Sequence, residues 1–177
     1  MRKRIIIGGI VVAVLFFAWF ADNRHGGALE TGGTYPESGA PMVGTDVYFM
    51  TFGLTNRSGG PLTVVTIDSD VITDGLEFVE ARIYTWDDFI GGVPATWTPG
   101  DGGLWTPETV ASVPAIGYRI SGHRGLDGKV MFAHFRVTTG RRPLTASGLR
   151  VTYRHGFREH MQTVPGVYSL TKPGSAG

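Results

Sequence analysis

Two hydrophobic patterns divide the chain. Residues 5–21 form a run of 17 residues without a charged or strongly polar side chain, directly behind the basic residues 2–4. As a helix rising about 1.5 Å per residue, this run would span roughly 25 Å, near the minimum for a membrane helix. From Asp46 onwards, short segments alternate between apolar and polar residues, which is typical of β-strands. We therefore predict a transmembrane helix over residues 1–21 and a β domain over residues 46–172.

The alternation is clearest in residues 46–55, where Tyr48 and Met50 fall on one face and Val47 and Phe49 on the other. Further strands are predicted over residues 62–68, 77–86, 116–121 and 129–139. Turn-forming Gly, Asn, Asp and Pro residues separate them. Six to eight short antiparallel strands in about 130 residues predict an all-β sandwich, with a small closed barrel as the alternative.

The last two predicted strands, residues 149–154 and 158–163, form a hairpin. We expect a three-residue loop over residues 155–157, because it pairs Val151 with Met161 and turns both toward the core. The same register gathers several cations on the solvent face. We call this group the basic stripe: Arg150, Arg154, Arg158 and His160.

The N-terminal helix has three further interpretations, which the residues disfavour. Cleavage after Ala21 or Ala18 would leave a bulky Trp19 or Phe16 three residues before the cut, where a signal peptidase needs a small residue. Lipidation needs a cysteine, which the chain lacks, and the processing site of a pilin is absent. An uncleaved signal anchor remains. Three basic residues precede it and only Arg24 follows closely, so we expect a cytoplasmic N-terminus and an extracytoplasmic domain.

Residues 22–45 are rich in Gly, Pro, Ser and Thr and are predicted to form a flexible stalk, while residues 173–177 are predicted to be a disordered tail. The lack of cysteine excludes disulfides and thiolate chemistry. The net charge of +1 points to no nucleic-acid partner. Charge is nevertheless uneven, because residues 44–110 carry ten acids and two bases and residues 119–172 the reverse. These halves either pair with each other or create a dipolar surface.

The least regular part of the domain is residues 86–105, which we call the Trp segment. Long irregular segments in compact domains are commonly functional, and tryptophan supplies the rigid amphipathic area that binding surfaces use. The alternative is a lid whose tryptophans cover one open end of the sandwich. The candidate binding residues are Trp86, Phe89, Trp97 and Trp105 of this segment and Arg150, Arg154 and Arg158 of the basic stripe.

Metal binding and catalysis have weaker signals. The ligands that copper could use are Met131, His134, His155, His160 and Met161. The expected register separates Met161 from His160, so we expect no metal site and no cofactor. The sequence contains no nucleophile elbow, zinc-protease helix or phosphate loop, so we expect no enzymatic activity. Residues 56–58 fit a glycosylation sequon, although a turn is the simpler interpretation.

Two stretches resemble a known group of proteins. Residues 48–68 (YFMTFGLTNRSGGPLTVVTID) resemble the opening hairpin of bacterial immunoglobulin-like (Ig-like) domains. Residues 148–166 (GLRVTYRHGFREHMQTVPG) resemble the closing hairpin of small membrane-anchored proteins of Gram-positive bacteria. The resemblance implies one N-terminal helix followed by an Ig-like ectodomain, and it implies no functional residues.

These observations predict a single-pass membrane protein whose Ig-like sandwich stands outside the cytoplasmic membrane. We expect it to act as an interaction or accessory module, with a protein partner in the same membrane or envelope. The alternative function is extracytoplasmic copper handling through His and Met residues.

Overall fold

The structure is a computed structural model that describes residues 27–30, 37–38, 42–51, 53–89, 92–98 and 109–171. Within these residues the chain is all-β and its only helical turns are short 3-10 turns, including η2 (Trp86–Asp88). No helix among them is long and apolar enough to cross a membrane. The predicted transmembrane helix and the predicted C-terminal tail lie outside the described residues.

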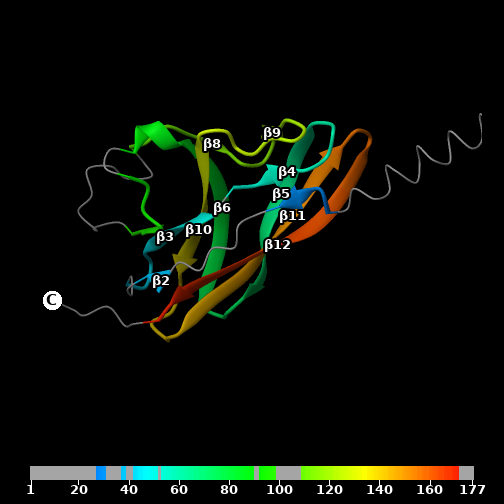
Figure 1. The fold of residues 1–177 in the computed structure, drawn as a ribbon. Coiled ribbons are helices and arrows are strands. Elements are labelled where there is room, and N and C mark those ends of the chain that lie inside the picture. The colour runs from blue at the N-terminus through cyan, green and yellow to red at the C-terminus, as the bar shows by residue number, and fades with distance from the viewer. Residues whose placement is uncertain are drawn as a thin grey trace, which may run out of the picture.

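Two five-stranded sheets form the domain (Figure 1). The first sheet has the spatial order β7 (Thr96–Trp97), β3 (Asp46–Thr51), β10 (Lys129–Val137), β6 (Leu76–Thr85) and β8 (Ser112–Pro114). The second sheet has the order β2 (Glu37–Ser38), β12 (Arg158–Leu170), β11 (Leu144–His155), β5 (Leu62–Ile72) and β9 (Arg119–Ile120). A separate pair joins β1 (Leu29–Glu30) to β4 (Thr55–Asn56). All pairings are antiparallel except β2 with β12.

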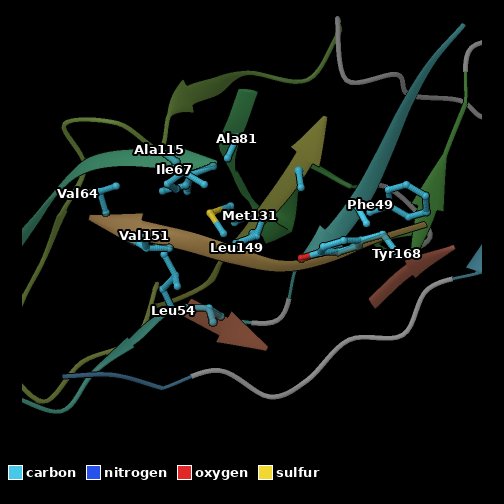
Figure 2. Packing of buried hydrophobic residues seen from close by; sticks show 14 of the residues in the cluster. Phe49, Leu54, Val64, Ile67, Ala81, Ala115, Met131, Leu149, Val151 and Tyr168 are labelled. Atoms are coloured by element: carbon cyan, nitrogen blue, oxygen red, sulfur yellow. The ribbon is translucent and has the colours of Figure 1, made fainter. Parts of the chain in front are cut away.

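One hydrophobic core lies between the two sheets (Figure 2). Phe49 of β3 packs against Phe135 of β10 and Tyr168 of β12, with ring centroids 5.8 and 5.4 Å apart. Met131 and Val151, from opposite sheets, are almost fully buried in the same cluster. The strand pairings confirm the predicted antiparallel arrangement, and alternate residues along these strands turn their side chains to this core.

The first sheet is also buried on its outer face. The residues Tyr48 and Met50, predicted to lie opposite Val47 and Phe49, join a second apolar cluster there. This cluster is completed by Tyr84, Phe89, Trp97, Val110, Val130 and Phe132. Strands β3 and β10 are thus covered on both faces, which explains why their residues are hydrophobic with little interruption.

The β11–β12 hairpin differs from the prediction. Its turn has two residues, Gly156 and Phe157, so that Val151 lies opposite Gln162 rather than Met161. Gly156 has a φ of 61°, which the first central position of a tight hairpin turn requires. Period-two reasoning failed here because the polar Gln162, and not Met161, occupies the face that points inward.

The new register divides the basic stripe. Arg150 and Arg154 lie on the outer face of the second sheet, whereas Arg158 and His160 share the other face with Tyr153. Met161, predicted to be in the core, is 65% exposed.

Part of the range predicted as a flexible stalk packs on the domain instead. Ala28 and Leu29 are buried in the main core. The Ala28 amide lies 3.3 Å from the Tyr153 hydroxyl, and the Ala28 carbonyl accepts a 2.7 Å bond from the Arg57 amide. Gln162 binds both the amide and the carbonyl of Leu29. The folded unit therefore includes residues well before Asp46.

Candidate functional site

The described part of the Trp segment covers the outer face of the first sheet. Trp97 is 5% exposed and meets the Tyr48 ring edge-on, with centroids 5.4 Å apart. Phe89 is also buried and packs against Tyr84. Trp86 is 45% exposed at the start of the segment. These residues cover a sheet face rather than the open end of the sandwich. Trp105 lies outside the described residues.

A surface cavity of about 410 Å³ opens beside this cover. It is lined by Tyr48, Glu80, Arg82, Tyr84, Val110, Ala111 and Ser112. Its volume falls within the roughly 300–1,000 Å³ usual for binding pockets. The lining combines two aromatic rings with one cation, one carboxylate and one hydroxyl, and such a set can bind both apolar and hydrogen-bonding groups.

Strand β6 supplies most of the polar lining. Glu80, Arg82 and Tyr84 alternate along it and share its outer face. The Arg82 guanidinium donates from Nε to the Ser112 hydroxyl at 2.8 Å and from NH1 to Glu80 at 3.2 Å, so its position is fixed. Sequence reasoning missed this site, although the period-two spacing of charged and aromatic residues was a usable signal.

A bulge beside the cavity changes the pairing of β6 with β10. His134 lies opposite Glu80 and Phe135 lies opposite Phe78, so Val79 is the extra residue. Such bulges re-aim the side chains that flank them. Glu80 accordingly lies on the outer face, where it borders both the cavity and His134.

His134 is a buried polar residue next to the cavity. It is 6% exposed and stacks on Tyr48 with ring centroids 4.3 Å apart. Its Nε2 lies 3.2 Å from Asp46, and its Nδ1 lies 3.9 Å from Glu80. The two carboxylates therefore approach opposite sides of one imidazole ring and do not converge on a common point.

Asp46 also accepts a 3.0 Å bond from Arg136 Nε. Partial burial by itself would raise the pKa of Asp46, but the hydrogen bonds from Arg136 and His134 outweigh it and the pKa is lowered. Asp46 thus stays ionised and holds two cationic or polar groups at the edge of the first sheet.

The structure does not gather the predicted copper ligands at one site. Met131 lies in the main core, whereas Met161 is exposed on the outer face of β12. His160 stacks on Tyr153 with ring centroids 5.6 Å apart. In the described ranges, no three or more His, Asp or Glu side chains are grouped so that they could hold a metal ion.

Two of the three predicted binding arginines of the second sheet form ion pairs. Arg150 contacts Asp70 at 2.6 Å and Arg154 contacts Glu159 at 2.7 Å. Arg158 lies across the hairpin turn, opposite His155. The structure therefore does not bring Arg158 onto the outer face with Arg150 and Arg154.

The two oppositely charged halves of the sequence meet in the fold. The pairs Asp46–Arg136 and Asp70–Arg150 each join an acid of the first half to a base of the second. Pairs within one half, such as Arg82 with Glu80, join residues that are close in sequence. Cross-half pairing thus accounts for part of the uneven charge distribution.

The sequon residue Asn56 has a structural place. Its side chain is fully buried and donates to the carbonyls of Gly60, Ile120 and Ser121. Its Oδ1 accepts from the amide and the hydroxyl of Ser58. The turn interpretation agrees with these bonds, and a buried amide is a poor acceptor for a sugar.

No protein-family model matches the chain, and no curated protein sequence matches it. Among solved structures, the chain is similar to the VesB protease of Vibrio cholerae, with 10% sequence identity and a TM-score of 0.40. The alignment covers 88% of this chain and 35% of the protease, so the chain spans about a third of the length of that protein. A likeness at this TM-score carries no argument about fold or activity.

Proposed function

We propose that this protein is a membrane-anchored, extracytoplasmic interaction module whose Ig-like domain binds a protein partner in the same membrane or envelope. In this proposal residues 1–21 are an uncleaved anchor and the domain catalyses no reaction. The observation that carries the proposal is the cavity beside the Trp segment, because its lining has the composition of a protein-binding site.

The strand order supports the Ig-like assignment. An Ig sandwich places strands B, E and D in one sheet and strands C, F and G in the other. Taken in chain order from β3, the six long strands here give β3-β10-β6 and β5-β11-β12, which is the same arrangement. The parallel contact of β2 with the last strand extends the second sheet. The chain lacks the disulfide of antibody domains, and β5 carries no tryptophan.

The cavity supports a protein partner. Tyrosine and arginine dominate the energetics of protein interfaces when they lie in a pocket beside apolar surface. Here Tyr48 and Tyr84 are buried in the second apolar cluster and form the floor of the cavity, while Arg82 and Glu80 offer opposite charges at the rim. Ser112 accepts a hydrogen bond from Arg82, an arrangement that serves positioning and not nucleophilic attack.

Anchoring makes a weak contact sufficient. Two proteins held in one membrane meet at an effective concentration far above that of free proteins, so a small interface is occupied. An interface around one cavity of this size is consistent with such a lateral contact.

Site-specific crosslinking in membranes tests the proposal. A photoreactive amino acid at Ala111, in the cavity wall, should crosslink the full chain to a distinct membrane protein. The matched control is the same amino acid at Thr66, which is exposed on the outer face of the second sheet. Changing Arg82→Glu should abolish the Ala111 product, while Arg141→Glu, in the exposed loop between β10 and β11, should not. Equal crosslinking from both positions, or none from Ala111, would refute a partner at the cavity.

A further inference from the structure

The β11–β12 turn ends in an exposed aromatic side chain. Phe157 is 106% exposed, and no part of the described domain covers it. We call the surrounding region the hairpin end; it comprises residues 27–30, 55–63, 119–124 and 153–160. One exposed phenylalanine is by itself unremarkable for a protein surface. Whether Phe157 marks a binding surface depends on the charges around it and on where the N-terminal segment meets the domain.

The hairpin end is basic. It carries two acids, Glu30 and Glu159, against five arginines: Arg57, Arg119, Arg124, Arg154 and Arg158. Arg119 and Arg154 both lie opposite Thr63, so they belong to one row across β9, β5 and β11. The formal net charge of these residues is +3, and both acids form ion pairs, Glu30 with Arg57 and Glu159 with Arg154.

The N-terminal segment enters the domain at this same end. The Ala28 carbonyl accepts a hydrogen bond from the Arg57 amide, which places the first described residues beside the turn that follows β4. Gly60 in turn touches His155, because a Cβ on Gly60 would lie 2.9 Å from its Nε2. Figure 1 shows the blue strand β1 beside β4 and the orange hairpin, while the red end of β12 lies on the other side of the molecule.

Distances allow this end to reach a bilayer. Residues 22–26, between the predicted anchor and Gly27, can span at most about 17 Å. The strand from Gln162, which binds Leu29, to Phe157 extends about 16 Å. The hairpin tip thus projects about as far toward the membrane as the connecting residues can stretch.

We infer that the hairpin end docks on anionic phospholipid, with Phe157 in the headgroup region and the arginines against lipid phosphates. This inference rests on the anchor of the proposed function. Aromatic side chains favour the membrane interface, and a basic surface close to anionic headgroups is attracted to them. Docking would hold the domain in one orientation on the membrane, since the anchor and the hairpin tip would be separate points of attachment.

A fluorescent label near the tip tests the docking. The chain has no cysteine, so Met161→Cys gives a single labelling site on the exposed face of β12. The full chain is reconstituted in nanodiscs of phosphatidylcholine, with or without phosphatidylglycerol, and quenching by headgroup nitroxide lipids is measured. We expect strong quenching only with phosphatidylglycerol. An Arg141→Cys label, in the loop between β10 and β11, should stay unquenched.

Variants of the hairpin end identify the groups responsible. Arg158→Gln and Arg119→Gln should each lower the docked population about fivefold, the effect of one arginine near an anionic surface. Phe157→Ser should weaken the quenching seen with phosphatidylglycerol, and Arg141→Gln is the matched control that should change nothing. A higher salt concentration should reduce the part of the quenching that depends on the arginines, because salt screens their attraction to the lipid phosphates.

The outcomes separate the two proposals. If alkaline carbonate extracts the chain from the membrane, residues 1–21 are not an anchor, and both the anchor and the docking that rests on it are refuted. If the chain stays integrated but the Met161→Cys label is unquenched, or is quenched equally in both lipid mixtures, docking on anionic lipid is refuted and the anchor stands. An Ala111 crosslink that persists when docking is refuted would show that the partner binds without it.

Discussion

Replacing Asn56 with alanine should destabilise the domain more than any other polar substitution at the hairpin end. The Asn56 side chain is fully buried and makes five hydrogen bonds, at 2.7 to 3.1 Å, to four residues. It thereby ties β4 to the turn that follows it and to the end of β9. Alanine cannot replace any of these bonds, and the carbonyl of Ile120 would lose its side-chain donor in a buried position.

The magnitude follows from the groups left without partners. A buried polar group that loses its partner costs about 1–3 kcal/mol, and water can rescue those near the surface. We therefore expect a loss of about 3 kcal/mol, a large share of the 5–15 kcal/mol typical of a domain. With a urea dependence of about 1.5–2 kcal/mol per molar, the unfolding midpoint should fall by about 1.5–2 M.

Urea unfolding of the full chain in detergent, followed by tryptophan fluorescence, measures this shift. Ser58→Ala is the graded control, because it removes only the hydroxyl bonds to Asn56 and Gly60 and should cost about 1 kcal/mol. Thr66→Ser, at an exposed position, should stay within about 0.5 kcal/mol. A fall of less than about 0.5 M for Asn56→Ala, with an unchanged slope, would refute the reasoning.

Three further predictions concern other parts of the domain. Gln162→Ala removes both bonds to the Leu29 backbone, so limited proteolysis should cut near residues 27–30 faster; an unchanged rate would show that other contacts hold the segment. Because the pKa of Asp46 is lowered in the folded protein, its ionised carboxylate stabilises the fold above the ordinary pKa of 3.8. This stabilisation is lost as the pH falls from 3.8 through the lower pKa of the folded state. Asp46→Asn should therefore lose less stability than the wild type in acid titrations, and equal acid branches would contradict this. Burial raises the pKa of Tyr168, so its tyrosinate absorbance should appear only on alkaline unfolding, and ionisation of the folded protein would count against a buried ring.

The strand pattern of the domain was predictable because each long strand has at least one continuous apolar face. The alternation around Tyr48 and Phe49 located β3, although the strand ends at Thr51 rather than at the predicted residue 55. It could not reveal that both faces of β3 are buried, since the cover comes from Phe89 and Trp97, which are distant in sequence. The cavity was missed for a similar reason: its walls come from β3, β6 and residues 110–112, and the period-two spacing on β6 indicates only one of these walls.

One residue, Gln162, explains why neither the hairpin register nor the packing of residues 27–30 on the domain was predicted. Gln162 looks like a solvent residue in the sequence, and so Met161 seemed to belong to the core. In the fold, the Gln162 amide satisfies both backbone groups of Leu29, which removes the cost of turning it inward. A polar residue that serves a distant backbone segment has no signature in its own strand, so neither its direction nor the docking of residues 27–30 could be derived locally.

The docked segment changes how an anchored domain would find its partner. A flexible stalk would let the domain sample every orientation above the bilayer, whereas in the proposed arrangement a connection of only five residues would restrict it to a narrower range. With the hairpin end toward the membrane, the cavity on the outer face of the first sheet would point sideways, because it lies on a sheet face and not at the end of the sandwich. A surface in that position suits a neighbour standing in the same membrane. An Ala111 crosslink that requires phosphatidylglycerol and Phe157 would therefore link the docking to the choice of partner.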